Sequence, residues 1–165
     1  MRVPEEIVGL MHLAGGADWQ WAAAIAAAES SFNPFAVPVS SAESRDPAHG
    51  LWQMKDSFVA DMLRNMGSRA ESLTAARGNP FVQAAAIRSF WSRYGSIELE
   101  EKLRIYHYGH DGAAALLGKA HTALAADVHA DVTAIADPDG YVEKVKAAHA
   151  ELFAPEPELE PKVAA

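Results

Sequence analysis

The chain has 165 residues, of which 50% are hydrophobic and 22% charged, a composition typical of one globular domain and not of a disordered chain. Its 14 Lys and Arg against 22 Asp and Glu give a formal net charge of −8, which argues against nucleic-acid binding through phosphate contacts. The absence of cysteine excludes a disulfide framework, a thiolate zinc site and a thiol nucleophile.

Apolar residues recur at helical spacing along the first part of the chain. This spacing predicts a helix over residues 4–14 that a Gly-Gly pair ends, and a second helix over 18–31 with Asp18 as its N-cap. Residues 33–50 are rich in Pro, Ser, Asp and Gly and show no periodic apolar pattern. Loops of that length usually carry function, so this segment is expected to do so.

The rest of the chain also favours helices. One is expected to start at Gln53 or Asp56 and to end before Gly67, and a clearer one follows Asn79 as its N-cap, with proline at the first position. Further helices are expected over 96–107, 112–125 and 138–153. The prediction is therefore an all-α domain over residues 1–153, followed by a Pro- and Glu-rich tail or linker over 154–165.

The second predicted helix carries an alanine-rich block and then Glu29 in its last turn. Apolar surroundings and the negative end of the helix dipole both raise the pKa of such a carboxyl group. A carboxyl group that keeps its proton near neutral pH can act as a general acid on a leaving oxygen. The local sequence also allows Glu29 to point to solvent or to accept hydrogen bonds from the following loop.

Several blocks occur in a defined order along the chain. They are ESSFNPFAV from Glu29, GLWQM from Gly50, GNPFVQ from Gly78, IYHYG from Ile105 and YVEKV from Tyr141. In this order they resemble the motifs of the soluble lytic transglycosylase catalytic domain. The resemblance implies a lysozyme-like, mainly helical fold with a groove beside a central buried helix, Glu29 as the catalytic acid/base, and a groove that binds peptidoglycan glycan strands.

The same resemblance implies a set of substrate-binding residues. They are Ser30, Ser40, Gln53, Tyr106, His107 and Tyr141. The chain departs from the family pattern in an expanded loop over 38–49, which leaves Ser40 or Ser41 as the expected serine, and in His107 where the family has asparagine. Trp52 replaces the commoner methionine and is either a flat platform for a sugar ring or a core residue.

The implied reaction is cleavage of the β-1,4 bond between N-acetylmuramic acid and N-acetylglucosamine. Glu29 would protonate the leaving oxygen and then take the proton of the muramic acid 6-hydroxyl, which closes a 1,6-anhydro ring. No metal and no organic cofactor are expected.

Two other functions stay open. In a hydrolytic muramidase (lysozyme) a second acid activates water, and the candidates for it are Glu43, Asp46 and Asp56. The favoured interpretation is that Glu43 and Asp46 are solvated loop charges and that Asp56 is an N-cap. A non-catalytic peptidoglycan-binding or phage-tail structural module is the other alternative. His107, His110 and Asp111 could ligate a metal, but a structural or substrate-contact role is favoured, because the set lacks a third histidine at helical spacing.

The net charge also bears on location, because an acidic protein has no long-range attraction to an anionic cell wall. The sequence shows neither a signal-peptide pattern nor an apolar run that could insert in a membrane. The resemblance implies action on the periplasmic or extracellular wall, and we expect the protein to be a monomer. It would be brought there as a phage endolysin, with a phage particle, or through a wall-targeting domain of a longer chain from which this segment is excised.

Overall fold

The computed structural model describes residues 1–37, 48–64, 76, 78–116 and 139–155, without the side chains of 110–116. Within these ranges every regular element is a helix, and the β-type pairing consists of an isolated bridge between His49 and Met54. The all-α prediction is therefore confirmed. None of the described helices is both long and apolar enough to cross a membrane.

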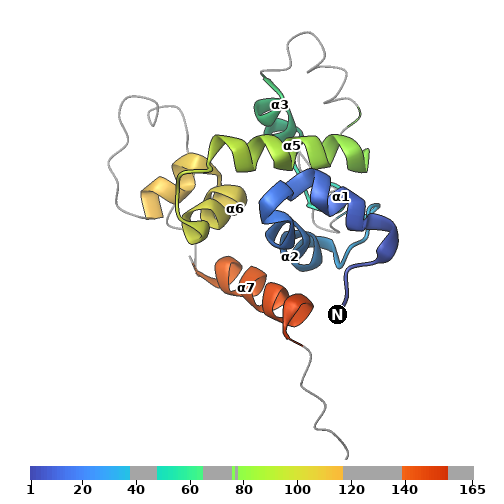
Figure 1. Cartoon of the computed structure of the whole chain (residues 1–165). Coiled ribbons are helices and arrows are strands. Elements are labelled where there is room, and N and C mark those ends of the chain that lie inside the picture. The colour runs from blue at the N-terminus through green and yellow to red at the C-terminus, as the bar shows by residue number, and fades with distance from the viewer. Residues whose placement is uncertain (38–47, 65–75, 77, 117–138, 156–165) are drawn as a thin grey trace, which may run out of the picture.

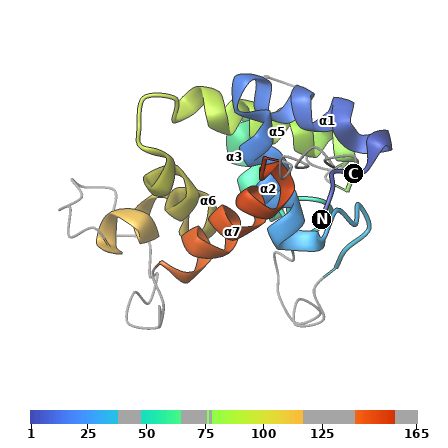
Figure 2. The ribbon, with the colours of Figure 1, turned by 60° about the horizontal axis from the view of Figure 1, so that its bottom comes forward.

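Helix α2 (Trp19–Ser30) lies at the centre of the fold, and other helices pack around it. The other described helices are α1 (Glu5–Gly15), α3 (Asp56–Met62), α5 (Pro80–Arg93), α6 (Leu99–Leu116) and α7 (Gly140–Phe153), with a short 3-10 turn, η1 (Gly16–Asp18), between α1 and α2. Helix α2 packs against α1 on one side and α7 on the other, and α5 lies between α1 and α3 (Figure 1). The turned view places α2 behind α7 in the middle of the molecule (Figure 2).

The centre of α2 is buried on all sides. Residues Ala22 to Ala26 have no exposed surface, and Ala27 is 5% exposed. Small side chains allow the neighbouring helices to approach closely, and a helix that is apolar all round is stable only when it is enclosed. The alanine block is thus the reason that α2 can serve as a central helix, as the sequence predicts.

One of the two predicted caps at acidic residues is confirmed in position, and the other is wrong. Asp18 occupies the N-cap position of α2 (φ −93°, ψ 22°), although its side chain makes no capping hydrogen bond. Asp56 is the first residue of α3, and Lys55 occupies the N-cap position. The cap at Asn79 is confirmed, since its Oδ1 accepts from the Phe81 amide at 2.9 Å.

Gly109 interrupts α6. Its backbone has φ 75° and ψ 166°, a conformation outside the helical region, so α6 consists of two helical segments joined by a kink. Glycine adopts positive φ without the steric penalty that a Cβ would bring. The sequence predicts separate helices over 96–107 and 112–125, and the break between them is confirmed; residues 117–125 lie outside the described part.

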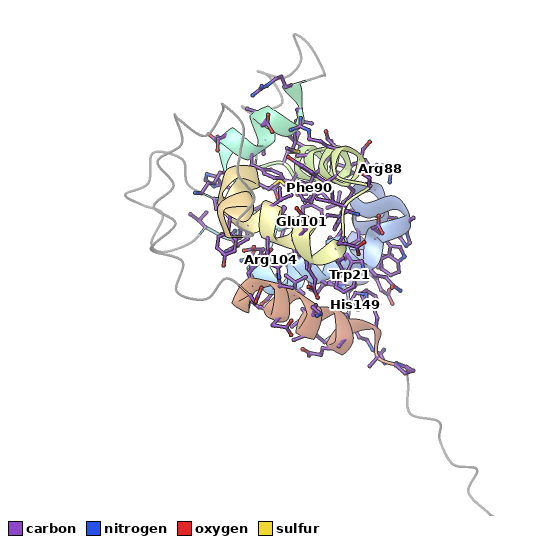
Figure 3. All side chains as sticks on the ribbon, turned by 90° about the vertical axis from the view of Figure 1, so that its left-hand side faces the viewer. Trp21, Arg88, Phe90, Glu101, Arg104 and His149 are labelled. Atoms are coloured by element: carbon purple, nitrogen blue, oxygen red, sulfur yellow. The ribbon has the colours of Figure 1, made fainter. Side chains whose placement is uncertain are left out.

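Side chains on another face join α7 to its neighbours (Figure 3). The rings of Trp21 and His149 stack with centroids 3.9 Å apart, which connects α2 to α7. Arg104 of α6 donates to Asp139, just before α7, at 2.7 Å. The stacked pair holds α7 on α2, and the Arg104–Asp139 contact holds the start of α7 on α6. Helix α7 carries Tyr141, which interacts with Glu29 near the end of α2.

Trp52 is a core residue. Its side chain is fully buried, and its Nε1 donates to the backbone carbonyl of Ala22 at 2.8 Å. The alternative in which Trp52 forms a sugar platform is therefore wrong. The indole instead ties the turn after the long loop to the alanine face of α2.

The close packing of α2 gives a testable prediction. Ala24→Leu is expected to lower the free energy of unfolding by about 1–3 kcal/mol, because a fully buried alanine leaves no room for three added carbons. Ala147→Leu, at an exposed position of α7, is the matched control and should change stability little. Urea unfolding of both variants measures the difference, and equal stability would contradict the packing described for α2.

Candidate active site

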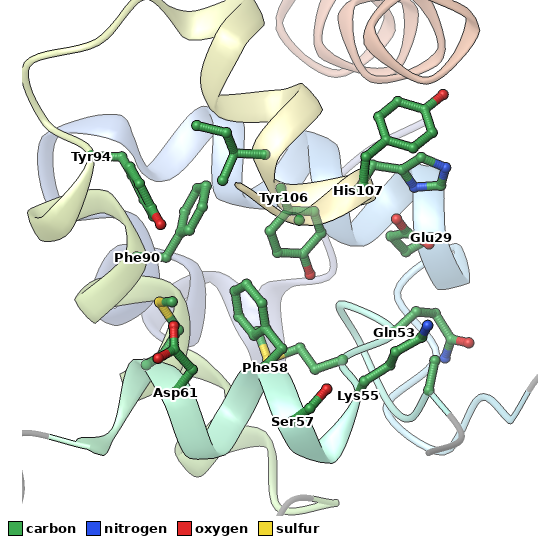
Figure 4. A pocket seen from close by; sticks show the side chains of 16 residues that line it. Glu29, Gln53, Lys55, Ser57, Phe58, Asp61, Phe90, Tyr94, Tyr106 and His107 are labelled. Carbon is green, nitrogen blue, oxygen red and sulfur yellow. The ribbon is translucent and has the colours of Figure 1, made fainter. Parts of the chain in front are cut away.

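A pocket of about 590 Å³ opens beside the C-terminal end of α2. Its wall combines residues of α2, α3, α5 and α6 with the turn before α3. The polar and charged wall residues include Glu29, Gln53, Lys55, Ser57, Asp61 and His107. Figure 4 shows Glu29, Gln53, Lys55 and His107 near one end, and Asp61, Phe90 and Tyr94 at the other. The pocket is therefore an elongated cavity with Glu29 near one end.

Glu29 is a half-buried carboxyl group in the wall of this pocket. Burial raises its pKa above the ordinary value of 4.5, because the charged form loses hydration. A hydrogen-bonding interaction with Tyr141 and the positive charge of Lys144 act in the opposite direction and are weaker than the effect of burial. The environment of Glu29 thus favours the protonated carboxyl while providing partners for the ionised one.

The chain leaves α2 abruptly after Glu29. Ser31 and Phe32 both have positive φ, 51° and 65°, which is an uncommon conformation for residues other than glycine. The Ser31 amide donates to the Ala27 carbonyl at 3.0 Å, and the Phe32 side chain is buried with 7% exposure. Burial of Phe32 and the terminal hydrogen bonds of the helix offset this strain. Glu29 is therefore held on the last helical turn.

The turn from Gly50 to Met54 is hydrogen-bonded to the helices around it. Ser30 Oγ donates to the Leu51 carbonyl at 2.7 Å, and the Tyr106 hydroxyl donates to the Trp52 carbonyl. Ser30 does not line the pocket, so its hydroxyl serves the turn, whereas Tyr106 lines the pocket and also holds the turn. The two predicted residues therefore lie beside Glu29 in different roles.

Gln53, near the end of this turn, has a strained backbone. Its φ is 46°, and its Nε2 donates at 2.9 Å to the carbonyls of both Ala36 and Gly50. Its Oε1 accepts no hydrogen bond from the residues that the structure describes. A Cβ at Gly50 would lie 2.4 Å from the Gln83 amide nitrogen, so the close approach of this turn to α5 requires glycine. The predicted residue Gln53 thus lines the pocket with a fixed side chain.

Tyr141 and His107 form a stacked pair next to Glu29. Their ring centroids are 4.0 Å apart at an interplanar angle of 10°. The Tyr141 hydroxyl is buried and interacts with Glu29, although the two groups do not meet in ideal hydrogen-bond geometry. Partial burial, followed by the charges of Lys144 and Lys55, lowers the pKa of His107 below 6.5. His107 therefore presents a neutral imidazole to the pocket near neutral pH.

Other predicted residues lie elsewhere. Ser40, Glu43 and Asp46 fall outside the described residues, as do the side chains of His110 and Asp111. Asp56 opens α3 but is not part of the pocket wall. The described residues contain no group of three His, Asp or Glu side chains arranged to hold a metal ion.

The sequence reasoning missed two charged wall residues. Asp61 lines the far end of the pocket and forms ion pairs with Arg93 at 2.5 Å and Arg64 at 3.1 Å. Lys55 lines the end near Glu29. The helical spacing of Phe58 and Asp61 on α3 is a signal that could have grouped them on one face, but nothing local shows which face meets Glu29.

The opposing influences on Glu29 give a second prediction. Tyr141→Phe should raise the pKa of Glu29 further, because the hydroxyl favours the ionised carboxylate and its loss removes that stabilisation. Tyr94→Phe, which removes a hydroxyl from the far end of the pocket, should leave this pKa unchanged. Titration of the ¹³C-labelled Glu29 carboxyl by NMR measures both variants. An unchanged or lower pKa in Tyr141→Phe would contradict the assigned contact.

Comparison with known protein families agrees with this geometry. The profile of the family described as "Transglycosylase SLT domain" matches residues 9–122, more than half of the chain, including Glu29, the Gly50 turn and Tyr106. Comparisons with curated proteins and with solved structures found no match. The chain belongs to the transglycosylase SLT domain family, whose members are glycan-cleaving enzymes of cell-wall peptidoglycan.

Proposed function

We propose that this protein is a lytic transglycosylase that cleaves the N-acetylmuramic acid–β-1,4–N-acetylglucosamine bond and forms a 1,6-anhydro product, with Glu29 as the single general acid/base. The observation that carries the proposal is the position of Glu29. It is a half-buried carboxyl group with a raised pKa in the wall of an elongated pocket. A carboxyl group in this state can donate a proton to a glycosidic oxygen.

In the first step the Glu29 carboxyl protonates the oxygen that leaves with N-acetylglucosamine. The bond from that oxygen to the muramic acid anomeric carbon breaks, and positive charge develops on this carbon. The acetamido group of the substrate stabilises the charge. Glu29 ends this step as a carboxylate, which Tyr141 and Lys144 both favour.

In the second step the Glu29 carboxylate takes the proton of the muramic acid 6-hydroxyl. The oxygen bonds to the anomeric carbon, the 1,6-anhydro ring closes, and Glu29 regains the proton that it donated. Both steps need Glu29 near the balance between its two protonation states, because an efficient acid/base has a pKa close to the working pH. Burial on one side and Tyr141 with Lys144 on the other supply opposing influences of this kind.

The surrounding residues divide into two roles in this proposal. Gln53 Oε1 and the imidazole of His107 contact substrate hydroxyl or amide groups, since both residues line the pocket near Glu29. Ser30 and Tyr106 are positioning residues that hold the Gly50 turn, and Tyr141 contacts Glu29 itself.

The muramidase alternative needs a second acid that activates water close to the scissile bond. The acid that shares the pocket with Glu29 in the described part of the chain is Asp61. It lies at the opposite end of the pocket and is ion-paired with Arg93 (Figure 4). This arrangement supports a reaction that uses one carboxyl group.

The proposed setting is a monomeric domain over residues 1–153 that acts on the periplasmic or extracellular wall. The last described helix, α7, ends at Phe153. Because the net charge of −8 gives no long-range attraction to an anionic wall, we propose delivery by a phage particle or by an attached wall-targeting domain.

The direct test of the proposal is loss of activity in Glu29→Gln. The clearing of a suspension of purified cell walls should slow by about 10²- to 10⁴-fold, because general acid/base catalysis is lost while the shape of the side chain is kept. Glu6→Gln, an exposed position on α1, makes the same change of charge and should clear walls as the wild type does. Equal clearing by wild type and Glu29→Gln would support the non-catalytic alternative.

Replacement of the other acids separates the two enzymatic alternatives. Glu43→Gln, Asp46→Asn, Asp56→Asn and Asp61→Asn should each retain clearing activity within about tenfold of the wild type, because none of these acids takes part in the proposed steps. A colorimetric assay of new reducing ends should show none above background for the wild type. Release of reducing ends that one of these replacements abolishes would identify a hydrolase and its second acid.

A further inference from the structure

Lys55 places a positive charge in the wall of the pocket. It is exposed, and it forms no ion pair with any residue in the described ranges. Figure 4 shows its side chain extending towards the end of the pocket that holds Glu29 and Gln53. Lys146 on α7 is different, because it is paired with Glu100 at 3.0 Å and with Glu143 at 3.3 Å. Lys55 therefore keeps its charge available to a ligand.

Lys144, on another element, does not line the pocket, but its charge acts on two residues that do. It is an exposed residue of α7, three positions after Tyr141, which stacks on His107. Its charge acts on both Glu29 and His107, and the charge of Lys55 acts on His107 as well. The ammonium group of Lys55, just before α3, thus lines the pocket, and that of Lys144, on α7, lies close enough to act electrostatically on Glu29 and His107.

This local charge contrasts with the whole molecule, whose formal net charge is −8. Burial raises the pKa of Glu29, which disfavours the charged carboxylate that would neutralise these lysines. Asp61 is paired with Arg93 at the other end of the pocket and does not neutralise them. Two cations that form no ion pair with the described residues, close to a reacting centre, form a binding position for an anionic group of the ligand.

We propose that Lys55 and Lys144 bind a carboxylate on the lactyl branch of the muramic acid residue at the scissile bond. This inference rests on the proposed function, because it assigns a second recognition element to the same substrate. The carboxylate has two sources: the lactyl group itself in strands without peptide, or the first free carboxylate of the attached stem peptide. Lysine suits either source, since its ammonium is a compact charge on a flexible stem.

Recognition of this group gives the enzyme a means of selecting its substrate. A neutral glycan such as chitin lacks the carboxylate, so it would bind without this attraction. The interaction lies at the surface of the pocket and is expected to weaken as salt screens it. The lysines would thereby provide, at short range, the attraction to an anionic wall that the net charge of the protein does not.

Binding in the Glu29→Gln background tests the inference without turnover. The probes are three GlcNAc–MurNAc tetrasaccharides, with free lactyl carboxylates, with lactyl groups blocked as neutral methylamides, and with lactyl groups extended by L-alanyl-D-isoglutamate. Calorimetry should show about three- to tenfold tighter binding of one or both anionic probes than of the neutral one. The anionic probe that is preferred identifies the source of the carboxylate.

Lys55→Met and Lys144→Met in the same background should remove most of this preference and leave binding of the neutral probe unchanged. Lys146→Met is the matched control, because it removes the same charge from α7 at a paired position and should keep the preference. In the active enzyme Lys55→Met should raise KM on the preferred anionic probe and leave kcat near the wild-type value, whereas Lys144→Met should raise KM and also change kcat, because its charge favours the Glu29 carboxylate.

The outcomes separate this inference from the proposed function. Equal binding of all three probes by the parent protein, or a preference that survives both replacements, would overturn the role of the lysines even if the enzyme cleaves walls. The opposite result is also distinct. If the wild-type protein cleaves nothing, but the preference for anionic probes is lost in Lys55→Met or Lys144→Met, the binding position would be upheld and the catalytic proposal refuted.

Discussion

Burial of the Glu29 carboxyl group at the end of the alanine-rich helix is the constraint on which the rest of the site depends. The fully buried alanines of α2 allow α1 and α7 to pack closely around it. Glu29, in the last turn, is therefore surrounded by protein on several sides, and its charged form loses hydration. The composition of the helix and the acidity of its last carboxyl group are consequences of the same packing.

The hydrogen bonds that fix the Gly50–Met54 turn serve stability and geometry together. The Ser30 hydroxyl of α2 donates to the Leu51 carbonyl, and the Tyr106 hydroxyl of α6 donates to the next carbonyl, that of Trp52. In the part of the chain that the structure describes, the residues with positive φ other than glycine lie at the end of α2 and at Gln53, beside Glu29. Strain of this kind is common at functional sites, where surrounding contacts hold the backbone in place.

Helical periodicity predicted most of the fold because apolar spacing is a local property of the chain. The end of α2 beside Glu29, the Asn79 cap and the break at Gly109 all followed from nearby residues. The position of Asp18 at the N-cap of α2 also followed, whereas the cap at Asp56 failed because the geometry of the preceding turn places Lys55 at that position. The ion pair of Asp61 and the exposure of Lys55 depend on how helices meet in space, which local patterns do not encode.

The central claim is that one carboxyl group carries both proton transfers. The surroundings of Glu29 support it, because burial favours the protonated carboxyl, whereas Tyr141 and Lys144 favour the carboxylate that the second step requires. Mass spectrometry of the muropeptides that the wild-type protein releases is the most direct measurement. The account predicts muramic acid termini lighter by one water than the hydrolysed form, which is the mass of the 1,6-anhydro ring. Termini with the full mass of the reducing sugar would contradict it.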